Sequence, residues 1–152
     1  MAVAFRSSST TGTSDSLTSS RNVPVPAGVQ AGDVILVAIE MWESSSTNPT
    51  VTPPAGFTLI VNVNLDADEG FERLKVWWKR ATGTDTGNYT FSWSGSQFNQ
   101  GQAIALSGAL ASGDPIGSNV NTATAASPTA NTPSTSLTGL TFEPFLAHFV
   151  AN

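Results

Sequence analysis

The residues of this chain that could do chemistry are its acids and a lone histidine. His148 is the only histidine, and it lies in the apolar run 145–150. A Ser-His-Asp site would have to use it, but a strand histidine with a satisfied hydrogen bond is the simpler interpretation. Because the chain has no cysteine, one histidine also leaves the usual zinc sites without enough ligands. We therefore expect neither a catalytic triad nor a zinc site.

Two groups of carboxylates remain as candidates. Glu40 and Glu43 flank Trp42, and an aromatic ring beside a pair of acids is typical of sugar-cleaving sites, although a strand end entering solvent also explains them. Residues 66–70 (Asp-Ala-Asp-Glu-Gly) resemble the first half of a calcium loop, but Trp77 stands where an EF-hand needs its last acid. A turn between two strands explains this segment. We expect no metal, no cofactor and no enzymatic activity.

Charge is scarce along the chain, and hydroxyl groups take its place. Only 11% of the 152 residues are charged, against about 25% in ordinary soluble domains, whereas Ser and Thr contribute 19 residues each. The net charge of −5 argues against a nucleic-acid partner, because phosphate binding needs a basic patch. The longest apolar run, 34–39, is too short to cross a bilayer, and no signal peptide is visible. We expect no nucleic-acid or membrane partner.

Alternating apolar and polar residues predict an all-β fold. The alternation is clearest in residues 57–65, 72–79 and 89–93, whereas residues 33–41 are apolar on both faces, which predicts a central strand. Thirteen glycines and nine prolines leave little room for long helices. Shorter stretches complete the set of expected strands: 2–8, 17–25, 102–106, 116–121 and 139–150.

The spacing of these strands favours a particular architecture. About ten strands with joints every 8–12 residues predict a two-sheet antiparallel β-sandwich that is jelly-roll-like, with a fibronectin-like sandwich as the alternative. We expect residues 1–152 to form a single domain. Residues 121–136 are almost wholly Ser, Thr, Ala, Asn and Pro, and we expect a long loop there.

The tryptophans divide by the strand face on which the alternation places them. Trp78 and Trp93 lie on apolar faces, so we expect them in the core. Trp77 lies on the opposite, basic face, where an exposed aromatic is typical of a protein interface, although a strand edge could also shield it. The candidate interface has four members: Arg73, Lys75, Trp77 and Lys79.

Several turn-and-strand segments follow one another in a fixed order over roughly residues 1–120. The first is 26–33 (Pro-Ala-Gly-Val-Gln-Ala-Gly-Asp), which precedes an apolar strand. The series continues with residues 52–60, 76–81, 88–94, 103–106 and 114–116. Together they resemble a β-sandwich module of tailed-phage and prophage structural proteins. Such modules usually show a second Gly-Asp turn before their last apolar strand, where this chain has Leu-Thr-Gly-Leu-Thr-Phe-Glu-Pro at 137–144.

The resemblance implies a structural protein of a bacteriophage virion, and it brings no catalytic residues with it. In such proteins the module occurs in minor tail proteins, fibres and head decoration proteins. A single short module favours a capsid decoration (cement) protein on the outer head surface, with the major capsid protein or other virion proteins as partners. We expect a homo-oligomer or lattice-bound copies, assembled in the host cytoplasm. The alternatives are a minor tail or fibre-tip protein that binds a host receptor and, from another class, a carbohydrate-binding domain.

Overall fold

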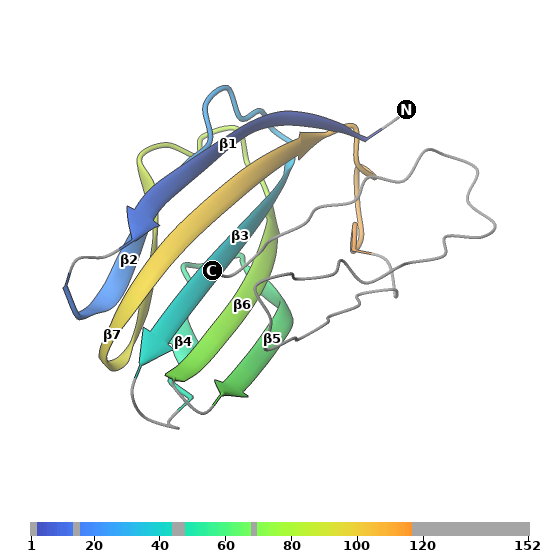
Figure 1. Ribbon diagram of the computed structural model, residues 1–152. Helices are drawn as coiled ribbons and strands as arrows, with labels where there is room; N and C mark the ends of the chain where they lie inside the picture. The colour runs from blue at the N-terminus through green and yellow to red at the C-terminus, as the bar shows by residue number, and fades with distance from the viewer. Residues whose placement is uncertain (1–2, 14–15, 44–47, 68–69, 117–152) are drawn as a thin grey trace.

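A computed structural model describes residues 3–13, 16–43, 48–67 and 70–116. Within these ranges the chain forms strands and no helix, so the all-β prediction is confirmed. The strands are β1 (Ala4–Thr13), β2 (Thr18–Pro24), β3 (Val34–Glu43), β4 (Val51–Thr52), β5 (Thr58–Ala67), β6 (Gly70–Arg80) and β7 (Asn88–Ser107) (Figure 1). The expected strand at 139–150, the loop at 121–136, His148 and nearly all of 116–121 lie outside the described residues.

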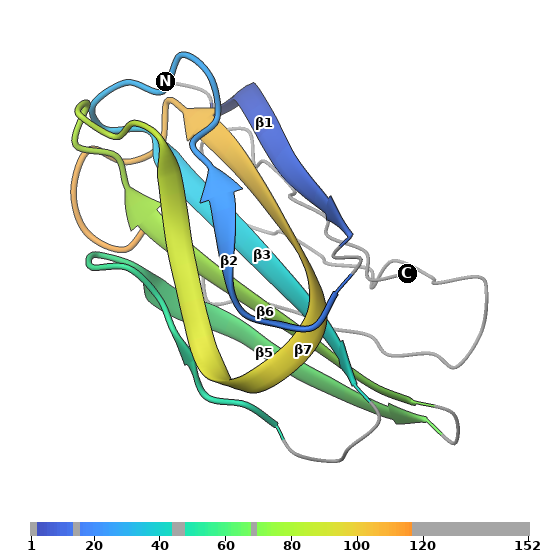
Figure 2. The same cartoon turned by 90° about the vertical axis from the view of Figure 1, so that its left-hand side faces the viewer.

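All strand pairings are antiparallel, and β7 belongs to two layers. Five strands pair in the order β1-β7-β3-β6-β5, and β2 and β4 also pair with β7. The first half of β7, residues 88–97, pairs with β2 and β4, whereas residues 98–107 pair with β1 and β3. Figure 2 shows β7 turning back so that its halves lie in different layers. Gly95 lies between the halves with φ 79°, a conformation that favours glycine. The layers agree with the expected sandwich, while the jelly-roll connectivity stays a prediction.

The main core lies between the two layers. β3 runs between β6 and β7 and is buried on both faces over residues 34–41, as its apolar sequence predicts. Its inner face meets the side chains of β2 and of the first half of β7: Val23, Tyr89, Phe91 and Trp93. Trp93 is therefore in the core as expected. Trp78 packs instead on the outer face of the five-strand layer, in a smaller cluster with Val34 and Leu36.

Candidate functional site

The four residues of the predicted interface lie on the inner face of β6, which points toward the second layer. Trp77 is 2% exposed, Arg73 1% and Lys75 5%. The ring of Trp77 lies 4.9 Å from that of Phe91 in β7, measured between centroids. The strand places these residues together, but the prediction that their face is exposed is wrong. The alternation along β6 correctly predicts which residues share a face. It does not show which of the two faces is turned toward the second layer.

Lys79, the fourth residue, is satisfied inside the protein. Its Nζ pairs with Asp85 at 2.5 Å and lies 5.6 Å from the centroid of the Phe57 ring and 5.2 Å from that of Tyr89. A carboxylate and two aromatic faces are favourable surroundings for a buried ammonium. The side chain therefore supports the core and is unavailable to a partner.

Asp85 gathers four donors in the turn between β6 and β7. It accepts hydrogen bonds from Lys79 Nζ, from Thr82 N and Oγ1 and from the Tyr89 hydroxyl. Burial alone raises the pKa of Asp85, but the Lys79 and Thr82 donors outweigh it and lower the pKa from 3.8 to about 2. Burial and the same carboxylate raise the pKa of Tyr89. These hydrogen bonds connect the turn to β6 through Lys79 and to β7 through Tyr89, so Asp85 has a structural role.

Lys75 lies beside a hollow of about 230 Å³ at β4, β5 and β6. Its Nζ donates to Asn48 Oδ1 at 2.8 Å and to Asn62 Oδ1 at 2.6 Å. Burial, and then the neighbouring charge of Arg73, lower the pKa of Lys75. A desolvated lysine on the wall of a hollow is a candidate binding group, and sequence reasoning had placed it on an open surface.

Two aromatic rings lie side by side on the outer face of the five-strand layer. Trp42 of β3 stands opposite Phe98 of β7, with ring centroids 5.7 Å apart and a 41° tilt. Trp42 is 42% exposed and Phe98 36%. Along the same two strands, the side-chain amide of Gln100 donates to the buried carboxylate of Glu40. Exposed aromatics in contact are typical of protein and sugar interfaces, so this pair is the best-placed external site.

The predicted pair of acids around Trp42 is only partly described. Glu40 is held by Gln100, as above, and the Glu43 side chain lies outside the described residues, as do the side chains of 66–70. Among the residues that the structure does describe, no group of three or more His, Asp or Glu could hold a metal ion. The same residues contain no helix long and apolar enough to cross a membrane.

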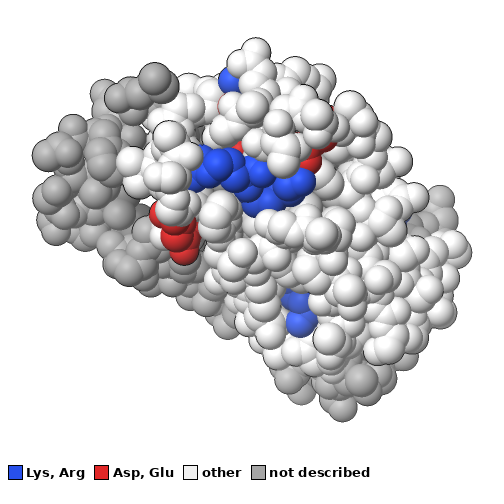
Figure 3. Space-filling view, turned by 180° about the vertical axis from the view of Figure 1, so that it is seen from behind, with Lys and Arg blue, Asp and Glu red and all other residues white. Residues whose placement is uncertain are grey.

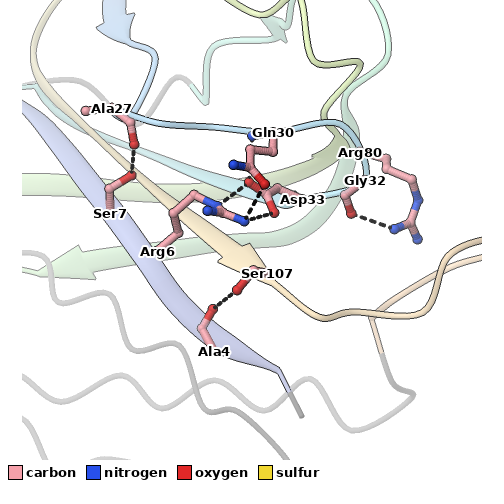
Figure 4. Close-up of polar contacts among 9 residues, drawn as sticks. All are labelled: Ala4, Arg6, Ser7, Ala27, Gln30, Gly32, Asp33, Arg80 and Ser107. Carbon is pink, nitrogen blue, oxygen red and sulfur yellow. Dashed lines mark hydrogen bonds and ion pairs between the residues drawn. The ribbon is translucent and has the colours of Figure 1, made fainter. Parts of the chain in front are cut away.

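A second hollow, of about 370 Å³, lies where β1 passes the turn before β3. Arg6 Nε lies 2.5 Å from Asp33 Oδ2, and Arg6 Nη2 donates to Asp33 Oδ1 at 3.0 Å. Asp33 also accepts the backbone N–H of Gln30, and Arg80 donates to the Gly32 carbonyl on the same turn (Figure 4). These contacts tie β1 and β6 to the turn. Because the acid and the guanidinium pair with each other, we assign this hollow a structural role.

All six Lys and Arg residues bond to groups of the chain itself. Arg21, for example, donates to Asn99 Oδ1 at 2.5 Å. Figure 3 shows one face, where Lys and Arg atoms gather mainly in one band beside Asp and Glu atoms and most of the described surface is uncharged. The cations therefore take part in holding the fold together, and uncharged residues make up most of the described surface on this face.

Comparison with known proteins adds no relative. No protein-family model, curated protein or solved structure matches the chain. The resemblance to phage structural modules therefore rests on the order of the turn-and-strand segments in the sequence.

Proposed function

We propose that this chain is a structural virion protein of a tailed phage, most specifically a capsid decoration protein on the outer head surface. The order of the turn-and-strand segments and the all-β fold support it. The observation that carries it is that all six cations are engaged within the fold. A surface of this kind suits an extended protein contact made of many neutral hydrogen bonds.

The Trp42–Phe98 pair is the part of the described surface best suited to anchor such a contact. Tryptophan and other aromatics are enriched at the energetic centres of protein interfaces, because each buries 150–250 Å² at low entropic cost. Both rings are exposed and touch each other, so a partner could bury them together. The neighbouring Gln100 side chain, which is half-buried, would add a polar group beside the rings.

The same pair supports a second candidate function, a carbohydrate-binding domain. Aromatic faces stack on sugar rings, and the half-buried Gln100, two residues from Phe98 on β7, could add a hydrogen bond to a sugar hydroxyl. Such a domain would also suit a fibre-tip protein that reads a host surface. Binding of purified protein to a glycan panel, without binding to phage heads, would favour this alternative.

Replacing both rings, Trp42→Ala with Phe98→Ala, is expected to weaken binding to virions about 30-fold or more, since anchor residues contribute about 2 kcal/mol or more. The double variant should remain folded, because both rings lie outside the main core and are partly exposed. The measurement is co-sedimentation of purified protein with virions assembled without it. Leu110→Ala removes another exposed apolar side chain and serves as the control. Equal binding by the double variant and the wild type would exclude the pair as the anchor.

A further inference from the structure

We propose that the hollow beside Lys75 is a binding site for a carboxylate, supplied by an acidic side chain of the protein that this chain contacts. The site itself follows from the fold, and only the identity of the carboxylate donor rests on the proposed function. The evidence for the site is that Lys75, a buried cation with only neutral hydrogen-bond partners, lies on the wall of an open hollow.

Lys75 is a buried cation without a carboxylate partner among the described residues. Its Nζ contacts only the amide oxygens of Asn48 and Asn62, whereas Lys79 on the same face has an acid at 2.5 Å. The Lys75 residue is 5% exposed. A buried charge is costly unless an opposite charge pairs with it. The arrangement therefore favours an incoming anion.

The hollow provides both access and a matching shape. An ammonium carries three N–H donors, and Asn48 and Asn62 accept two of them, so one donor remains for a ligand. Leu59 and Trp77 form an apolar wall beside these polar groups. The volume of about 230 Å³ suits the end of a side chain rather than a larger molecule. An Asp or Glu side chain fits this lining, because its carboxylate can accept from Lys75 and its methylene groups can contact the apolar wall.

Lysine labelling makes the site directly measurable, because Lys75 and Lys79 are the only lysines in the chain. The experiment is NMR of the full chain carrying ¹³C-labelled lysine, with acetate added as a model for the partner's carboxylate. We expect acetate to shift the Lys75 side-chain signals saturably, at concentrations on the order of 10 mM as befits a four-atom ligand. It should also raise the apparent pKa of Lys75, since an anion favours the ammonium. Lys79, already paired with Asp85, should not move and is the internal control.

Other anions decide whether the response is specific. Chloride at the same ionic strength should produce no saturable shift, and phosphate should bind more weakly than acetate because the wall is partly apolar. Equal shifts with chloride would overturn the site, and tighter binding of phosphate would overturn its assignment to a carboxylate. Lys75→Met should abolish the acetate response while keeping or raising the melting temperature, because it removes an unpaired buried charge.

Particle binding then tests the donor separately. Lys75→Met should bind virions about tenfold more weakly than the wild type, as expected for the loss of a charge-assisted hydrogen bond. Arg80→Gln, which removes one charge at a residue outside the lining of this hollow, should bind like the wild type. Undiminished binding by Lys75→Met would overturn the assignment of the partner as carboxylate donor. Failure of the wild type to bind virions would contradict the proposed function and leave the acetate result standing.

Discussion

Trp77→Ala is expected to lower the free energy of unfolding by about 3–5 kcal/mol, the cost of a large cavity in a core. Trp77 is 2% exposed, and its ring lies 4.9 Å from Phe91 across the two layers. Trp93→Ala should cost a similar amount, because Trp93 is buried in the same cluster and its Nε1 donates to the Thr18 carbonyl at 3.0 Å. Chemical denaturation monitored by circular dichroism measures both changes.

Trp42→Ala is the matched control for these two variants. Its residue is 42% exposed, so its removal should lower the free energy of unfolding by about 1–2 kcal/mol, clearly less than for Trp77→Ala. If Trp77→Ala proved as stable as Trp42→Ala, the inner face of β6 could not lie between the layers.

Asp85→Asn is expected to cost about 2 kcal/mol or more at neutral pH, and this cost should disappear in acid. The pKa of Asp85 falls from 3.8 to about 2 in the folded protein. A folded-state pKa below the unfolded value means that the ionised carboxylate stabilises the fold above pH 3.8, and that this contribution is lost as the pH falls toward 2. The variant also leaves the Lys79 ammonium without its counter-charge, which adds to the cost at neutral pH.

The free energy of unfolding of the wild type and of Asp85→Asn, measured at pH 7, 4 and 2, tests this pH dependence. The two proteins should differ most at pH 7 and converge at pH 2. Asp114→Asn, at an exposed acid that accepts only a local backbone bond, should stay within about 0.5 kcal/mol of the wild type. A gap between wild type and Asp85→Asn that is the same at pH 7 and pH 2 would show that the carboxylate charge is not what holds the turn.

The strands themselves could be predicted because period-2 alternation is a local signal. The expected strands 57–65 and 72–79 correspond to β5 (Thr58–Ala67) and β6 (Gly70–Arg80). The sequence predicts two strands here, 89–93 and 102–106, separated by residues 94–101. The structure keeps this region in one strand, and Gly95 supplies the bend that carries β7 from one layer to the other.

The burial of Lys75 and the contact between Trp42 and Phe98 could not be predicted from the sequence. Whether a polar strand face is buried depends on residues far away in the chain. Lys75 donates to Asn48 and Asn62, which come from another strand and from the segment before β4. Local alternation assigns cations to solvent by default, so the basic face of β6 looked exposed. The contact of Trp42 with Phe98 is equally non-local, since it depends on the pairing of β3 with β7.

Counting the copies of this protein on purified virions, before and after a wash in about 1 M salt, tests most directly whether it binds an assembled lattice largely through neutral contacts. At that salt the Debye length is about 3 Å, so electrostatic attachment is screened. We predict copies comparable in number with the major capsid subunits, retention through the wash, and release by heat or denaturant, which act on buried apolar area. Only a few copies per particle would contradict the head-decoration role, and wholesale release in salt would contradict the neutral attachment.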